Sequence, residues 1–423
     1  MGFFSKKPPD ADYVPQINEQ AVAAFDRALG NFGPVAHSFS PGGQPMRSVG
    51  IVTVGGPRPY TLLVTYGFSE VLAPEPMRMG FRHEFSLAVP QGEPIAPWAD
   101  AFLRAQCHSM LAQRVDVKAG ECIPFNGIPM TCMAFQPEHH AMMPPTSLVG
   151  MFVATDPVIP SVDTPAGPVE VRRLVGIDQY EIDRALTWDP PAFLELMRGV
   201  DPLLLSTLQR PSYLTQAPFR EAVEKRAASE GSTVEGVQLG MSWQPFPGIL
   251  RIQLPQGSGM VRALNAIRGR LGFGRKLVAF SQVGAPITFA PGTPDMNITP
   301  QVVELTGDLT TPPIATILAA LEAGAAYVDL AILAPSPARA RQRFFARVAT
   351  CVKDSELTSN LNKQLEKLLD EARAMAAVEH EVPEADRGAD RAAVAALVRT
   401  LRFARSTDQT AIEAMIKILS RET

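Results

Sequence analysis

The residues best suited to chemistry are cysteines and histidines between positions 107 and 140, which could together ligate zinc. They are Cys107, His108, Cys122, Cys132, His139 and His140. Structural zinc sites hold their thiolates in close pairs, with roughly two to four residues between them, because this spacing preorganises tetrahedral ligation. The cysteines here follow one another after 15 and then 10 positions (107 to 122 to 132). We therefore predict buried thiols, no metal site and no cofactor, with a metal-dependent enzyme built on this set as the alternative.

A second candidate is a general base, because His83 directly precedes Glu84. Both fall in a stretch from Phe81 to Val89 in which one face is apolar, a pattern that predicts a strand. Neighbouring side chains on a strand point to opposite faces of a sheet, so His83 and Glu84 cannot form a dyad. His83 shares its face with aromatic residues and is predicted to be a hydrogen-bonded core histidine.

Signatures of the common enzyme classes are missing from the sequence. It contains no G-x-S-x-G, H-E-x-x-H, C-x-x-C or G-x-x-x-x-G-K-[ST] motif. The stretch nearest to a phosphate-binding loop runs from Gly269 to Lys276, with Arg275 where such a loop has its lysine. We interpret it as a basic surface turn. The sequence thus predicts no catalytic residue and no enzyme.

Bulk composition argues against several other functions. The 423-residue chain is 46% apolar and 19% charged, with a net charge of −4, as in a globular protein. Lys and Arg number 15 against 21 Asp and Glu up to residue 216, and 24 against 22 after it, so we expect no nucleic acid partner. The chain has only four cysteines, no run of about 18 apolar residues, and no apolar secretory signal at its N-terminus. We therefore expect a cytoplasmic protein without a membrane partner.

The elements that position these residues predict an α/β (α+β) fold. After an N-terminal tail and helix, residues 1–29, we expect a domain over residues 30–216 with a mainly antiparallel sheet and flanking helices, because its strands follow one another closely. Asp178 and Glu181 form a capping box that begins one helix. Arg210 is expected to pair with Glu84 or Asp201. The strands are expected at 48–56, 60–68, 81–89, 148–155 and 169–177, with a Pro-rich connection at 157–168.

The remainder of the chain shows a different pattern of residues. Residues 217–336 predict a second α/β domain, in which a strand, a helix and a strand over 302–333 form a βαβ-like pattern. Residues 337–423 predict a helical C-terminal region, since leucines there form an apolar stripe. The acidic segment 379–390 is expected to be mobile because it has almost nothing apolar to bury.

Seven segments of the first domain, in order, resemble the suppressor-of-fused family. Tyr66 to Glu70 (YGFSE) is similar to the end of a family strand, and Gly80 to Leu87 (GFRHEFSL) to the strand that follows. The others are residues 97–103, residues 155–157 with 164–167, residues 174–177 with Glu181 and Trp188, residues 201–206, and residues 210–212. Seven matches in the family's order make chance an unsatisfactory explanation.

The resemblance implies a mixed α/β domain that holds another protein as a short extended peptide. Animal members hold a transcription factor, and bacterial relatives occur among proposed immunity proteins that neutralise toxins. The resemblance also places Asp156 beside the groove that takes the partner, and we predict Asp156, Pro157 and Tyr66 as the partner-binding residues. From the residues alone, Asp156 has two interpretations: an exposed carboxylate that receives the partner, or the start of an Asx-turn.

Three functional hypotheses follow. The first is a non-enzymatic binding module for a protein or extended peptide, with an immunity protein as its more specific form, since an open sheet edge can accept a strand. The second is the metal-dependent enzyme described above. The third is a structural adaptor whose C-terminal helices form an oligomer, although the sequence does not give an oligomeric state.

Overall fold

The computed structural model describes residues 19–39, 48–69, 72, 81–281, 284–299 and 301–332. Contacts group the chain into two compact units. The first comprises residues 1–239 with 255–278, and the second comprises 240–254 with 279–423. The predicted helical region 337–423 lies outside the described residues, as does most of the N-terminal tail.

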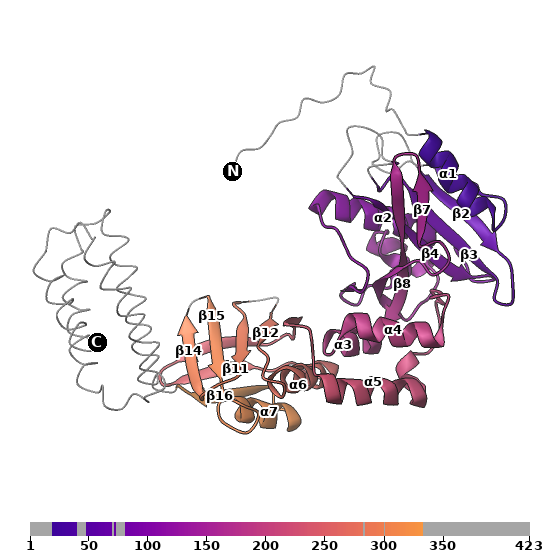
Figure 1. Ribbon diagram of the computed structural model, residues 1–423. Helices are drawn as coiled ribbons and strands as arrows, with labels where there is room; N and C mark the ends of the chain where they lie inside the picture. The colour runs from indigo at the N-terminus through magenta and orange to yellow at the C-terminus, as the bar shows by residue number, and fades with distance from the viewer. Residues whose placement is uncertain are drawn as a thin grey trace, which may run out of the picture. The chain divides into compact units, whose positions relative to one another are not determined.

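The first unit is built on an eight-stranded mixed sheet (Figure 1). Its strands run in the order β1-β2-β3-β4-β8-β6-β5, and β7 also pairs with β8. The pair β4–β8 is parallel and the other pairs are antiparallel. The predicted mixed, mainly antiparallel fold is therefore confirmed. The strands are β1 (Ala36–Phe39), β2 (Ser48–Val54), β3 (Tyr60–Tyr66), β4 (His83–Pro90), β5 (Cys122–Pro124), β6 (Leu148–Thr155), β7 (Ser161–Thr164) and β8 (Gly167–Asp178).

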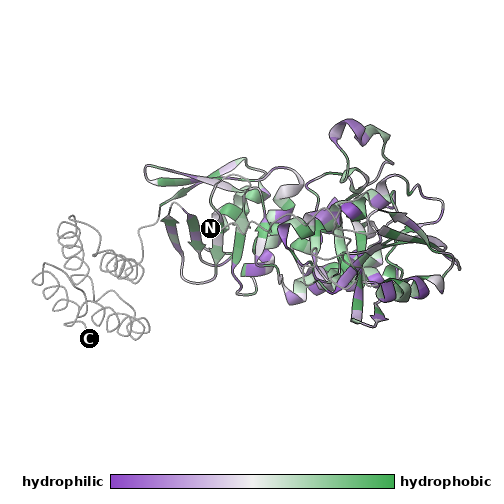
Figure 2. Ribbon diagram, turned by 90° about the horizontal axis from the view of Figure 1, so that it is seen from above, coloured by the Kyte–Doolittle hydropathy of each residue, from purple (hydrophilic) through white to green (hydrophobic). Residues whose placement is uncertain are grey.

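Helices cover both faces of this sheet because its strands are apolar on both sides. Leu62 packs in the cluster that contains α1 (Glu19–Gly30), and its neighbour Leu63 packs in the cluster that contains α2 (Trp98–Gln113). Trp98 and Phe102 of α2 are fully buried, and each such side chain contributes roughly 1.5–3 kcal/mol. In Figure 2 the helices carry both purple and green residues, as expected where one side of a helix meets a core.

The described residues of the first unit form four further helices. A third cluster joins Phe152 of β6 and Val175 of β8 to the helices that follow β8. These helices are α3 (Gln179–Leu186), α4 (Pro190–Val200) and α5 (Ala217–Glu230), with η3 (Tyr213–Thr215) between α4 and α5. The fourth, α6 (Ser258–Leu271), was not predicted, and it takes in the first residues of the expected basic turn at 269–276. The shorter elements are η1 (Met130–Cys132), η2 (Pro137–Met142) and β9 (Gly236–Gln238).

The described residues of the second unit form two sheet segments and one helix, α7 (Ile314–Glu322). Strands β10 (Ser242–Phe246), β11 (Ile249–Gln253) and β16 (Tyr327–Ala331) form an antiparallel sheet. Strand β15 (Val302–Thr306) pairs with β13 (Ile287–Ala290) and β14 (Asp295–Thr299). The predicted strand, helix and strand over 302–333 are found as β15, α7 and β16. They do not form a βαβ unit, however, because β16 pairs with β11 in the other sheet. Strand β12 (Leu277–Phe280) spans the boundary between the units.

Two further features differ from or add to the predictions. The expected Pro-rich connection at 157–168 contains strand β7, which forms a hairpin with β8. Among the described residues, no helix is both long and apolar enough to cross a membrane.

Candidate functional site: a buried ion pair behind an open strand edge

Asp156 lies in the turn between β6 and β7 and is almost completely buried. Its Oδ2 accepts a hydrogen bond from Nη2 of Arg173 at 2.8 Å and another from the Ser86 hydroxyl at 2.5 Å. Its Oδ1 accepts from the backbone N–H groups of Val158 and Ile159, each at 2.8 Å. One carboxylate therefore neutralises a buried guanidinium and also fixes the turn that leads into β7.

This geometry decides between the two interpretations of Asp156. The bond from the Val158 amide, two residues on, is that of an Asx-turn, which is confirmed. The expectation of an exposed carboxylate is wrong, because Asp156 and Arg173 both have fully buried side chains. Arg173 also donates to the carbonyl of Leu203 at 3.0 Å. A buried arginine needs such partners because an unpaired charge in a core is costly.

The other two predicted site residues lie in different surroundings. Pro157 is exposed and directly follows Asp156 in the turn. Tyr66 is fully buried on β3, where its hydroxyl donates to Asp26 of α1 at 2.9 Å and its ring meets Phe25 edge-on. The structure thus unites Asp156 and Pro157 in one turn and places Tyr66 against α1.

The adjacent residues His83 and Glu84 have separate roles. Glu84 is fully buried and accepts five hydrogen bonds, from the Thr65 and Ser69 hydroxyls and from the backbone N–H groups of residues 67–69. Burial raises its pKa to about 7, and these bonds oppose the rise. His83 packs among aromatic rings, and burial, followed by the charge of Arg172, lowers its pKa to about 4. The prediction of a core histidine is confirmed.

A second buried ion pair joins Glu181 to Arg210. The two nitrogens Nη1 and Nη2 of Arg210 donate to the two carboxylate oxygens, each at 2.6 Å. The predicted pairing of Arg210 with Glu84 or Asp201 is therefore wrong. The capping box is confirmed, because Asp178 accepts from the Glu181 N–H while Glu181 accepts from the Asp178 N–H. Glu181 thus completes the capping box of α3 and also accepts from the backbone N–H of Tyr213 at the start of η3.

Comparison with known proteins identifies this sheet-based region. Residues 46–211 match the family profile of Suppressor of fused protein (SUFU). This part of the chain is a SUFU-like domain. The match falls within the predicted range 30–216, so the predicted resemblance is confirmed.

Individual relatives match either over a shorter part of the chain or at a lower sequence identity. The human and mouse Suppressor of fused homologues are each 29% identical over 99 residues, which make up 22% of this chain and 20% of each relative. The crystal structure of Drosophila Suppressor of Fused aligns with a TM-score of 0.51 and 15% identity, over 72% of this chain and 91% of that one. At that identity the structural match supports the shared fold alone.

The SUFU-like domain has an unpaired strand edge at β7. Val171 N–H donates to the carbonyl of Pro160, and bonded positions alternate along an antiparallel pair. The register then makes Val162 and Thr164 the bonded residues of β7. Ser161 and Asp163 direct their backbone N–H and C=O groups away from β8. No other strand of the described residues pairs with β7.

The cysteines of the SUFU-like domain test the predicted alternative of a metal site. Within the described ranges, no three His, Cys, Asp or Glu residues lie close enough together to hold a metal ion. Cys107 and Cys132 are buried. Burial raises the pKa of the Cys122 thiol to about 12 and that of Cys107 above its usual value, so neither thiol ionises near neutral pH.

Proposed function

We propose that the protein is a non-enzymatic binding module that holds an extended segment of a protein partner along β7. The observation that carries this proposal is the pair of outward-facing backbone groups at Ser161 and Asp163. A partner strand that paired with them would extend the sheet by main-chain hydrogen bonds, and its side chains would add selectivity.

The surroundings of β7 favour this use of the edge. Asp156 holds the turn before β7 through two backbone hydrogen bonds, so the edge is fixed before a partner arrives. A preorganised edge loses less conformational entropy on binding. Asp163 is an exposed carboxylate on the same strand, which favours a basic or hydroxyl-bearing segment. Asp156 is then a positioning residue that does not itself touch the partner.

The family comparison supports the class of function. The human and mouse relatives bear the name Suppressor of fused homolog, and residues 46–211 match the profile of that family. As the finer part of the proposal, we suggest a cytoplasmic immunity protein whose partner is a toxin. Co-expression with the product of a neighbouring gene tests that part: the chain restores growth that the toxin stops.

Proline substitution tests the role of the edge. Ser161→Pro with Asp163→Pro removes the two outward N–H donors, while the bonded positions on β7 keep theirs. The control, Ser161→Ala with Asp163→Ala, removes the same side chains and keeps the N–H groups. Both baits are compared with the natural chain in quantitative affinity purification from the native host.

The expected result is a partner retained by the natural and alanine baits and lost from the proline bait. Equal recovery on all three baits, each with an unchanged melting temperature, refutes edge pairing. Loss from the alanine bait as well would place recognition in the side chains.

A further inference from the structure

A hollow of about 400 Å³ lies on the first unit between α3, η3 and the beginning of α6, a size typical of sites that bind ligands. Leu214 of η3 contributes to its lining. Tyr180 of α3 and Val261 of α6 also line it, although 70% and 59% of their surfaces are exposed. Large apolar side chains this exposed and this close together are typical of a surface that another molecule covers.

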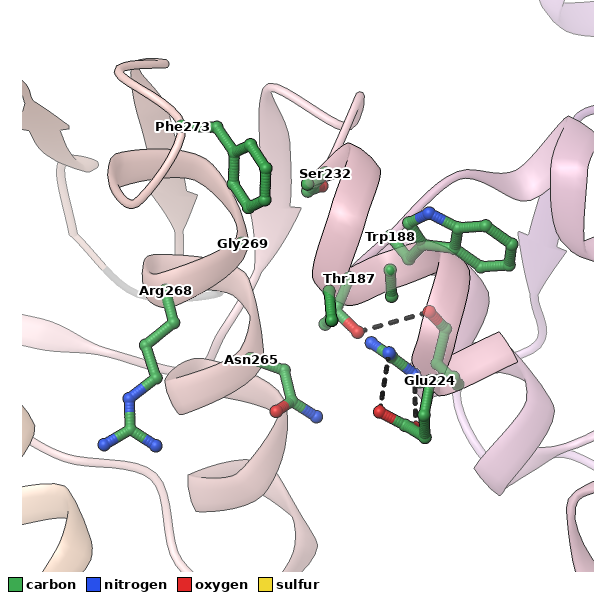
Figure 3. Close-up of a pocket in the computed structure, with 12 residues that line it drawn as sticks. Thr187, Trp188, Glu224, Ser232, Asn265, Arg268, Gly269 and Phe273 are labelled. Carbon is green, nitrogen blue, oxygen red and sulfur yellow. Dashed lines mark hydrogen bonds and ion pairs between the residues drawn. The ribbon is translucent and has the colours of Figure 1, made fainter. Parts of the chain in front are cut away.

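A second hollow of about 190 Å³ adjoins the first along α6. Figure 3 shows Asn265 and Arg268 of α6 on one side of it, and Thr187, Trp188 and Glu224 on the other. Arg184 and Asn265 line both hollows. We call the two hollows together the α6 groove.

The charge of α6 indicates what the groove receives. Residues 258–276 contain five cationic residues and no Asp or Glu, within a chain whose net charge is −4. The five are Arg262, Arg268, Arg270, Arg275 and Lys276. Asp183 of α3 offsets one of these charges, since it pairs with Arg262. Glu224 of α5 pairs with Arg184 of α3 and leaves the charge of α6 unchanged.

Four of these five cationic residues lie in the last turn of α6 or directly after it. Arg270 and Arg275 both donate to the carbonyl oxygen of Ser232, at 2.9 and 2.8 Å. This shared acceptor is a neutral carbonyl, which cannot cancel two positive charges. Burial, followed by the charge of Arg275, lowers the pKa of Arg270, and the negative charge of Glu235 opposes part of this decrease. A negative group brought to this end of α6 would relieve the repulsion.

From the apolar lining and this charge, we infer that the α6 groove binds an acidic segment of a protein partner. A large apolar side chain of that segment fills the hollow between Tyr180 and Val261. Its carboxylates lie toward Arg268 and the end of α6. The site is distinct from the β7 edge, so either can fail without the other.

Four labelled peptides test this inference by fluorescence anisotropy with the full chain. Each contains one central residue between two charged or polar flanks: Trp between Glu flanks, Ala between Glu flanks, Trp between Gln flanks and Trp between Lys flanks. The Glu-flanked Trp peptide is expected to bind at least about tenfold more tightly than each of the other three, or about 1.4 kcal/mol. Its affinity should fall as salt is raised, because the rim charges are exposed.

Two variants and two controls locate the binding. Val261→Glu places a negative charge at the hollow, and Arg268→Glu reverses an exposed rim charge; each is expected to weaken the acidic peptide about tenfold. The matched controls are Val200→Glu on α4 and Lys225→Glu on α5, which substitute exposed residues outside the groove. The controls should bind as the natural chain does, and so should the chain with prolines at the β7 edge.

Several results would overturn the inference. One is no binding of the acidic Trp peptide at about 1 mM, and another is equal binding of the Lys-flanked peptide. Equal weakening by the control variants would place binding elsewhere. Tight binding of a single-stranded RNA oligonucleotide that displaces the peptide would show a nucleic acid site, and a concentration-dependent mass that Val261→Glu abolishes would show a second copy of the chain.

Discussion

Removing the carboxylate of Asp156 is expected to destabilise the first unit severely. Asp156→Ala leaves the guanidinium of Arg173 without its only carboxylate partner among the described residues, in a position where both side chains are fully buried. Breaking a buried ion pair in this way costs roughly 3–5 kcal/mol. For a unit of this size, roughly 2–4 °C are lost per kcal/mol, so the melting temperature should fall by about 6–20 °C.

Asp156→Asn separates the two tasks of this side chain. An asparagine oxygen can still accept from the Val158 and Ile159 amides, but it cannot neutralise Arg173. If the ion pair dominates, Asn should cost nearly as much as Ala. The control is Asp163→Ala, which removes an exposed carboxylate from β7 and should change stability by less than about 0.5 kcal/mol.

Urea unfolding and thermal melting followed by circular dichroism provide the measurements. The account of Asp156 is refuted if Asp156→Ala melts within about 2 °C of the natural chain, well below the shift worked out above. A mild effect of Asn beside a large effect of Ala would instead assign the stability to the turn.

Two further changes test other parts of the first unit. Glu84 has its pKa raised to about 7, so its contribution to stability is full below its ordinary pKa of 4.5 and is lost as pH rises through about 7. His83 has its pKa lowered to about 4, so its contribution is full above its ordinary pKa of 6.5 and is lost as pH falls through about 4. Between pH 4.5 and 6.5 the two contributions change in opposite directions. In Glu84→Gln only the His83 contribution remains, so the free energy of unfolding should rise with pH by roughly 1.4 kcal/mol per pH unit over this range. A pH dependence equal to that of the natural chain would contradict this. Arg210→Lys should lose one of the two charged hydrogen bonds to Glu181. The free energy of unfolding in urea should therefore fall by roughly 1.5–3 kcal/mol. The control is Arg226→Lys at a partly exposed position, and an equally small loss in both variants would show that the Glu181–Arg210 pair contributes little.

Features governed by local pattern could be predicted from the sequence. The capping box of Asp178 and Glu181 depends on residues three positions apart, and it forms as expected. His83 was placed in the core by strand alternation alone. Strand β6 was predicted with its observed bounds because apolar residues fill it and Pro157 follows closely.

Pairings between distant residues could not be predicted in the same way. Arg173 and Asp156 are 17 positions apart, and Arg210 and Glu181 are 29 apart, so only the folded chain brings them together. One signal was present: Arg173 lies in the inward row of β8 with Val171 and Val175, where a cation needs a buried acceptor.

Helix α6 and strand β7 were missed because glycine and proline obscured them. Gly259 and Gly269 interrupt an otherwise helical spacing of Ala263, Ile267 and Leu271, which are buried on one side of α6. Prolines on both sides of β7 favoured an irregular connecting segment in place of a strand. An edge strand nevertheless tolerates proline where its N–H would face outward.

The central proposal is that β7 receives a partner strand, and amide hydrogen exchange at that strand tests it most directly. The amides of Ser161 and Asp163 face away from β8, so they should exchange fast in the free chain. Once the purified partner is added at saturating concentration, these two amides should be protected, while the amides of Val162 and Thr164 are already protected by β8. Unchanged exchange at Ser161 and Asp163 in a saturated complex would contradict the proposal.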